Sequence, residues 1–178
     1  MGWQNHRCDT YVLKFSPSHV SLHQIYSVKV NAIIPWAFIQ NHSLWAGGDP
    51  NPGCAFVVDG TGGYIVQPGY YYYKQMCRAG QPGMGVARTR TNDTEIAPVA
   101  FCRNGTQNPD AFVVLSTGEQ NRGVKDVAVG VTGSAHKHFR AYRTSATQQW
   151  KDLGVFAVND GTVRCEMPPR SVTSFFGV

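Results

Sequence analysis

Residues 31–45 read NAIIPWAFIQNHSLW, and the first nine form a nearly continuous apolar run that only Asn31 and Pro35 interrupt. A strand with water on one face alternates apolar and polar residues. A strand that is apolar at successive positions is typically covered on both faces, as in a parallel α/β sheet. Residues 16–30 predict a helix, because Ser16 can cap it and Pro17 suits its first turn. Together the two segments predict one helix–strand unit of a repeating fold.

The rest of the chain predicts a mainly β domain. Nineteen Gly and ten Pro indicate many turns, and residues 47–53 (GGDPNPG) form a dense turn cluster. A hairpin is expected over residues 54–66 and a short helix over residues 70–78, with Pro68 and Gly69 as a break between them. Eight short strands then follow at sandwich spacing, at residues 84–89, 96–103, 111–116, 124–131, 138–144, 154–158, 162–167 and 171–176. This pattern predicts an antiparallel two-sheet β-sandwich over residues 49–178, preceded by the helix–strand unit over residues 1–48.

Charge and hydropathy argue against nucleic acid and against a membrane as partners. The net charge is +5, and five arginines could make a basic face: Arg88, Arg90, Arg103, Arg140 and Arg143. The chain has no basic run, no helix-turn-helix signature and no RNA-binding motif, so these arginines are expected on solvated strand faces and no nucleic acid is predicted. No apolar run is long enough to cross a membrane, and residues 1–9 lack the apolar core of a signal peptide. Met1 is therefore expected not to be the natural start of the protein.

The metal-ligand residue types predict no metal or cofactor. None of the five cysteines forms a C-x-x-C pair, which argues against a zinc ribbon, and their odd number leaves at least one thiol free. His19 and His23 lie four residues apart, but no third ligand accompanies them. His136 and His138 could hold a metal with Asp126, although a polar hairpin end is the favoured interpretation.

The order of these segments resembles the C-terminal part of clan A glycoside hydrolases, most closely glycoside hydrolase family 30. The matching residues are, in chain order, Asn31, Ala32 and Trp36, then residues 71–73, 78–83, 99–101, 108–110, 142–144 and 168–175. Each motif is short, and the ordered set covers nearly the whole chain. The resemblance implies the last helix and strand of a (β/α)8 barrel, followed by a side β-sandwich. It also implies a secreted parent enzyme.

The catalytic residues of that family have no counterpart here. Its retaining mechanism needs two carboxylates about 5 Å apart. In the family these lie on the fourth and seventh barrel strands, upstream of anything in this chain, and residues 1–3 resemble those that follow the nucleophile. Glu95, Glu119 and Glu166 are expected to be surface acids. No catalytic residue is predicted, and whether the chain is itself an enzyme stays open.

Four aromatic residues are the candidate carbohydrate contacts, because a pyranose stacks its apolar face on flat aromatic rings. Trp36 matches a family subsite position and Trp45 follows nine residues later, while Tyr71 and Trp150 are further candidates. For each, packing within the protein is the competing interpretation.

Three functions follow as hypotheses. The favoured one is an accessory domain of a family-30-like hydrolase that could bind β-linked polysaccharide without a catalytic pair of its own. The alternatives are a truncated glycosidase that uses Glu95, Glu119 or Glu166, and a purely structural domain. The expected partners are a polysaccharide or oligosaccharide and the missing catalytic barrel. Because the strand at residues 33–39 lacks barrel neighbours, we expect it to pair with the sandwich, to fold over it or to pair between chains, which favours a homo-oligomer.

Overall fold

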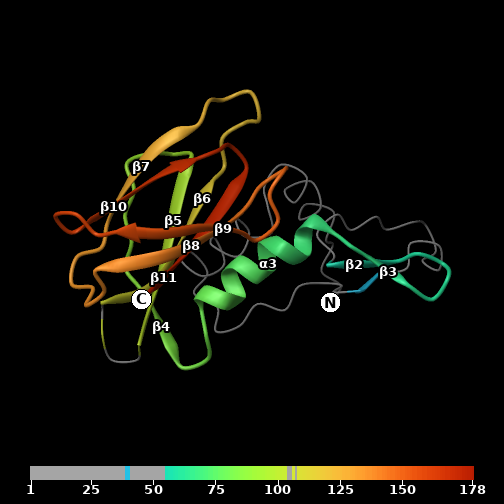
Figure 1. Cartoon of the computed structure of the whole chain (residues 1–178), viewed down its shortest axis with the longest axis horizontal. Coiled ribbons are helices and arrows are strands. Elements are labelled where there is room, and N and C mark those ends of the chain that lie inside the picture. The colour runs from blue at the N-terminus through green and yellow to red at the C-terminus, as the bar shows by residue number, and fades with distance from the viewer. Residues whose placement is uncertain (1–38, 41–54, 104–105, 107) are drawn as a thin grey trace, which may run out of the picture. The chain divides into compact units, whose positions relative to one another are not determined.

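A computed structural model describes residues 39–40, 55–103, 106 and 108–178 (Figure 1). The chain divides into two compact units, Met1–Tyr73 and Lys74–Val178. The predicted helix at residues 16–30 lies outside the described residues, as does the predicted domain boundary at residues 48 and 49. Both remain predictions.

The described part of the first unit contains a three-stranded sheet built on the predicted hairpin. Its strands are β1 (Ile39–Gln40), β2 (Phe56–Val58) and β3 (Tyr64–Val66), and β2 pairs in parallel with β1 and antiparallel with β3. The Asp59 carboxylate closes the turn, because it accepts hydrogen bonds from the N–H groups of Thr61 (2.9 Å) and Gly63 (3.1 Å). The end of the predicted strand at residues 33–39 therefore pairs with the chain's own hairpin.

Helix α3 (Pro68–Ala79) begins earlier than predicted. The expected break at Pro68 and Gly69 was wrong, because proline has a fixed φ and lacks an N–H, and both properties suit the first turn of a helix. The helix ends at Gly80, whose N–H donates to the Met76 carbonyl (2.9 Å). The side-chain amide of Gln81 donates to the Cys77 and Arg78 carbonyls and so satisfies acceptors that the last turn leaves free.

The second unit is an antiparallel β-sandwich, which confirms the predicted fold class. One sheet has six strands in the order β4-β5-β6-β11-β8-β9, and the other pairs β7 with β10. The strands are β4 (Met84–Ala87), β5 (Ile96–Arg103), β6 (Pro109–Ser116), β7 (Lys125–Gly130), β8 (His138–Thr144), β9 (Lys151–Ala157), β10 (Thr162–Met167) and β11 (Ser171–Gly177). β9 begins before Gly154, where the sequence had placed its start. Gly154 lies inside the strand, where the pairing with β8 shifts register between Ala141 and Tyr142. Its φ of 85° accommodates this irregularity, and the strand continues on both sides of it.

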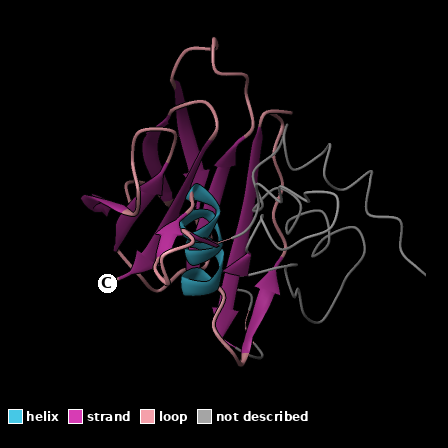
Figure 2. Ribbon diagram, turned by 90° about the vertical axis from the view of Figure 1, so that its right-hand side faces the viewer, coloured by secondary structure: helices cyan, strands magenta, loops and turns pink. Residues whose placement is uncertain are grey.

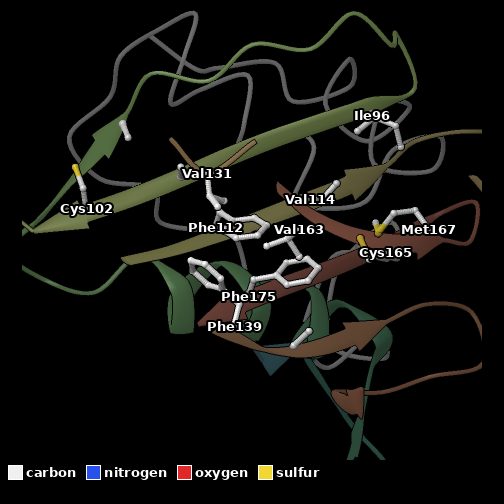
Figure 3. Packing of buried hydrophobic residues seen from close by; sticks show 13 residues of the cluster. Ile96, Cys102, Phe112, Val114, Val131, Phe139, Val163, Cys165, Met167 and Phe175 are labelled. Atoms are coloured by element: carbon white, nitrogen blue, oxygen red, sulfur yellow. The ribbon is translucent and has the colours of Figure 1, made fainter. Parts of the chain in front are cut away.

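The core lies between the two sheets (Figure 3). The ring of Phe112 stacks on Phe175, with centroids 4.5 Å apart, and meets Phe139 edge-on at 5.1 Å. Val163 on β10 is fully buried and belongs to the same cluster, to which it contributes from the smaller sheet. Alternate residues of each strand supply the core, as expected for strands that face another sheet.

The six-stranded sheet is also covered on its other face. The 74–79 half of α3 packs there (Figure 2), and the side chain of Gln75 is fully buried. A Cβ on Gly80 would lie 2.6 Å from the Phe101 ring, which shows how closely the chain approaches β5. Every residue of β6 except Asp110 is buried as a result. β6 therefore has the apolar run that typifies a strand covered on both faces.

Burial between the sheets shifts the pKa of two side chains, Arg143 and Cys165. Arg143 is only 8% exposed, so the expectation that it belongs to a solvated face was wrong. Its guanidinium donates to the Thr173 hydroxyl (3.1 Å) and to the Glu166 carbonyl on β10, and burial lowers its pKa. Burial also raises the pKa of the Cys165 thiol to about 11. Within the described ranges, Cys77, Cys102 and Cys165 are free thiols.

No helix in the described part of the chain combines the length and the apolar character that a membrane span requires.

Candidate functional site

Trp150, one of the predicted carbohydrate contacts, lies in the turn between β8 and β9. Its backbone has φ 52°, in the left-handed region that a bulky residue rarely adopts. The turn is held by a hydrogen bond from the Ser145 N–H to the Gln148 carbonyl (2.8 Å). The Trp150 N–H also donates to the Thr144 hydroxyl (3.3 Å). Such strain persists only where surrounding contacts fix it, and it marks positions worth testing for function.

The Trp150 side chain belongs to an aromatic cluster on the six-stranded sheet. It stacks on Tyr142 with centroids 4.8 Å apart and planes 10° apart. Phe176 lies 5.9 Å from Tyr142 and 6.3 Å from Trp150, and the Lys74 ammonium lies 4.7 Å from the Trp150 ring centre. We call Lys74, Tyr142, Trp150 and Phe176 the Trp150 cluster. All four residues are half-buried, so each retains some exposed surface.

Both faces of the Trp150 ring have a neighbour. A ring stacked in parallel covers one face, which leaves the opposite face for the Lys74 ammonium as a cation–π contact. A sugar could stack on Trp150 only if Lys74 moved aside. An ammonium on a flexible side chain can do so more easily than a packed ring can.

An ion pair borders the cluster on the β8–β9 side. Arg140 donates from Nε to the Asp152 carboxylate (3.1 Å), and its Cζ lies 6.0 Å from the Tyr142 ring centre. The hydrogen bond from Arg140 lowers the pKa of Asp152, and the same bond raises the pKa of Arg140. Both groups are therefore charged at neutral pH. Planar hydrogen-bonding groups beside partly exposed aromatic rings are the elements that sugar hydroxyls and sugar faces require.

A buried hydrogen-bond network connects the cluster's turn to helix α3. The Gln75 side chain donates from Nε2 to the Thr144 hydroxyl (2.9 Å), the same oxygen that accepts the Trp150 N–H. The Ser174 hydroxyl lies 2.5 Å from Gln75 Oε1 and 3.1 Å from the Gln75 carbonyl, and can donate to either. The network therefore joins α3, β8 and β11 behind the aromatic rings.

Tyr71, a second predicted contact, lies in a separate cluster in the first unit. It meets Tyr70 edge-on at 5.1 Å, and Tyr70 lies 5.3 Å from Phe56. Phe56 in turn meets Tyr64, which is 66% exposed. Tyr71 thus packs against other aromatic residues and is itself half-buried. Trp36 and Trp45 lie outside the described residues.

The carboxylates weighed as catalytic candidates are exposed or paired with cations. Lys125 lies 2.7 Å from both Asp93 and Glu95, and Arg122 lies 3.7 Å from Glu95. The hydrogen bond from Lys125 lowers the pKa of Asp93. A general acid must instead keep its proton near neutral pH. Glu119 and Glu166 are exposed to solvent.

The histidine pair and Asp126 lie in different polar contacts. His136 Nε2 lies 3.3 Å from Asp110, whereas Asp126 lies 3.6 Å from Arg164. Across residues 55–103, 106 and 108–178, no group of three or more His, Cys, Asp or Glu side chains has a metal-binding arrangement.

Sequence reasoning found Trp150 but missed its neighbours. Tyr142 and Phe176 lie on adjacent strands, where Tyr142 pairs with Ser174 and Phe176 pairs with Arg140. This register brings the two rings into diagonal contact. The sequence offered one usable signal: Tyr142 lies on the predicted strand 138–144, which ends six residues before Trp150. The pairing of β8 with β11 was also needed, and no local pattern specifies it.

Comparison with known proteins gives a match only in structure. No protein-family model matches the chain, and no curated protein matches its sequence. The fold, however, is similar to that of several solved glycoside hydrolases. The GH30 endoxylanase of Clostridium papyrosolvens C71 has a TM-score of 0.68 at 17% identity, over 90% of this chain and 36% of that one.

Two further xylanases show the same relation. The family 30 subfamily 8 xylanase Xyn30A of Clostridium acetobutylicum has a TM-score of 0.69 at 16% identity, over 98% of this chain and 39% of that one. The GH30 xylanase C catalytic domain of Talaromyces cellulolyticus has a TM-score of 0.66 at 15% identity, over 90% of this chain and 34% of that one. This chain thus spans little more than a third of the length of these enzymes. At the level of the fold, the resemblance to the C-terminal part of family 30 glycoside hydrolases is confirmed.

Proposed function

We propose that this chain is a carbohydrate-associated β-sandwich accessory domain of a family-30-like glycoside hydrolase, without a catalytic carboxylate pair of its own. The observation that carries the proposal is the structural match to three xylanases over 90% or more of this chain. The partners are a β-linked polysaccharide and the catalytic barrel of the parent enzyme, which we propose to be secreted.

The Trp150 cluster supports the carbohydrate contact. It offers two stacked rings that are each half-buried, and the Arg140–Asp152 ion pair offers charged donors and acceptors next to them. Stacking contributes about 1 kcal/mol beyond area burial, and displacement of Lys74 from the Trp150 face opposes it. A site of this size would bind with a dissociation constant near the millimolar range, where the binding free energy is about −4 kcal/mol.

The Lys125 ion pairs support the lack of hydrolysis. A retaining glycosidase needs one protonated and one ionised carboxyl group about 5 Å apart. Asp93 and Glu95 share a single ammonium at 2.7 Å, which favours the ionised form of Asp93. Asp93 is therefore held in its ionised form and does not supply the protonated carboxyl group.

The test is retardation of the protein in native gels that contain xylan, β-glucan or galactan. We expect weak retardation that Trp150→Ala abolishes. Tyr64→Ala, which removes an exposed ring in the first unit, is the control. Its mobility relative to a gel without polysaccharide should match that of the unaltered protein, so a change in oligomeric state alone is not counted as retardation. Trp36→Ala and Trp45→Ala test the two predicted contacts outside the described residues.

Two outcomes would contradict the proposal. Release of reducing sugar that Glu95→Gln abolishes would show a glycosidase. Failure of every polysaccharide to retard the protein would leave a purely structural domain, which the close packing around Trp150 also allows.

We also propose that the isolated chain forms a homo-oligomer. The support is β3, which lies at an edge of its sheet among the described strands and whose Tyr64, Ile65 and Val66 are 66%, 54% and 38% exposed. An exposed apolar edge strand is a template for pairing with another chain. Light scattering at tens of micromolar tests this proposal, and a monomeric mass would refute it.

A further inference from the structure

A groove of about 770 Å³ lies on the sandwich between β7 and the connection from β4 to β5. Below it lies the core-facing side of β5 and β6, where Pro98 is half-buried and Ile96, Phe112 and Val114 are buried in the core. Figure 3 shows the side chains of Ile96, Phe112 and Val114 on this face. Among the described residues the smaller sheet has two strands, against six in the larger one.

Within the part of the chain that the structure describes, the strand that borders the groove has one open edge. β7 pairs only with β10 among the described residues, and the Val131 N–H donates across that pair to the Gly161 carbonyl (2.8 Å). Backbone groups point alternately to the two sides of a strand. The odd-numbered residues of β7 therefore bond to β10, and the N–H and C=O groups of Asp126, Ala128 and Gly130 point to the open edge.

The groove has room for a single strand and not for a second copy of this chain. Symmetric antiparallel pairing of two β7 strands keeps both core-facing sides on the same side of the joined sheet. The six-stranded sheet of the second copy would then have to lie where β5 of the first copy lies. A lone extended segment avoids this clash, because it brings no sheet beneath it.

The wall opposite β7 is cationic. Arg88 and Arg90 line the groove, both are exposed, and neither has a carboxylate partner among the described residues. Lys125, the cation at the start of β7, is already paired with Asp93 and Glu95. Acidic side chains on a bound segment would therefore meet two available guanidinium groups.

From these observations we propose that the groove binds an extended peptide segment of another polypeptide, which adds a third strand to the small sheet at the β7 edge. The segment has apolar residues at alternate positions, on the side of the half-buried Pro98, Val127 and Val129. Its acidic residues lie near Arg88 and Arg90. Main-chain hydrogen bonds to an open edge give affinity in this mode of recognition, and alternate side chains give specificity.

The test uses the full chain and a fluorescein-labelled peptide, EVTVEVTV, followed by fluorescence anisotropy. Ala128→Pro removes an N–H on the open edge without removing a hydrogen bond to β10, and proline is tolerated at such positions. We expect Ala128→Pro to weaken binding about tenfold. Ala128→Ser keeps the N–H and is the matched control, with unchanged affinity. The double variant Arg88→Ala with Arg90→Ala should remove the preference for this peptide over KVTVKVTV.

Hydrogen exchange of the unaltered protein is the second measurement, and it does not depend on whether the proline variant folds. The amides of Asp126, Ala128 and Gly130 should exchange fast in the free protein and slowly with the peptide. The proposal is overturned if these amides stay unprotected, or if Ala128→Pro and Ala128→Ser bind equally well. It is also overturned if the same amides become protected by self-association without peptide, since the occupant would then be a second copy.

Discussion

Replacement of Gln75 by alanine should destabilise the second unit strongly, because Gln75 is fully buried and polar on the helix that covers the six-stranded sheet. The change removes the hydrogen bond to Thr144 (2.9 Å) and the contact of Oε1 with the Ser174 hydroxyl (2.5 Å). The Ser174 hydroxyl can still donate to the backbone carbonyl of residue 75. The Thr144 hydroxyl keeps the Trp150 N–H as its donor. No buried hydroxyl is left wholly unpaired.

The expected loss is the sum of two terms. Two buried hydrogen bonds contribute about 1 kcal/mol each. The lost side-chain volume leaves a cavity that costs about 1–2 kcal/mol, less than for a large apolar side chain because the amide carries little transfer free energy. The free energy of unfolding should therefore fall by about 3–4 kcal/mol, a large part of the stability of a domain of this size.

Urea unfolding followed by far-ultraviolet circular dichroism measures this loss. Cys77→Ala is the matched control, since Cys77 is an exposed residue on the same helix and should change the free energy by less than about 0.5 kcal/mol. A Gln75→Ala, Thr144→Val double-mutant cycle should give a coupling energy of about 1 kcal/mol. A loss for Gln75→Ala no larger than that for Cys77→Ala would show that the helix does not stabilise the sheet through this network.

Three further perturbations test other contacts. Lys125 lowers the pKa of Asp93, so their contact stabilises the fold above the unfolded pKa of about 4 and is lost as pH falls below it. The stability advantage of the native protein over Lys125→Met should therefore shrink from pH 6 to pH 3 in thermal unfolding. Arg143→Met should lower the free energy of unfolding by about 2 kcal/mol, because it leaves the Glu166 carbonyl without the Arg143 donor. Unfolding in urea measures this loss. Gly80→Ala should cost about 1–3 kcal/mol by calorimetry, because its Cβ would lie 2.6 Å from the Phe101 ring.

Local patterns located the strands well. The bounds of β5, β8 and β10 agree with the predicted residues, since each has several β-branched or aromatic residues between clear turn signals. The start of α3 was missed because Pro68 was read as a break, although proline also suits the first turn of a helix. The start of β9 was missed because Gly154 was read as a boundary, whereas it lies inside the strand at a register shift.

The candidate site was less predictable because it depends on pairing between distant strands. Trp150 could be chosen from its residue type, but its contact with Phe176 needs β11 to lie beside β8, and its contact with Lys74 needs the 74–79 half of α3 to cover the same sheet. The buried position of Arg143 likewise follows from the side of β8 on which it lies, next to the carbonyl of Glu166 on the other sheet. Composition alone placed this arginine in solvent.

The position of β11 has a consequence for how the protein is made. β11 lies between β6 and β8 in the six-stranded sheet, yet it follows both in the sequence. As the chain leaves the ribosome, β4, β5 and β6 can pair with one another, and β8 can pair with β9, but the two groups have no strand between them until residues 171–177 emerge. A nascent chain that ends before Ser171 would hold two partial sheets, each with an open apolar edge. Formation of the native sandwich must therefore follow synthesis of its central strand, as expected for a fold whose contacts join distant parts of the sequence.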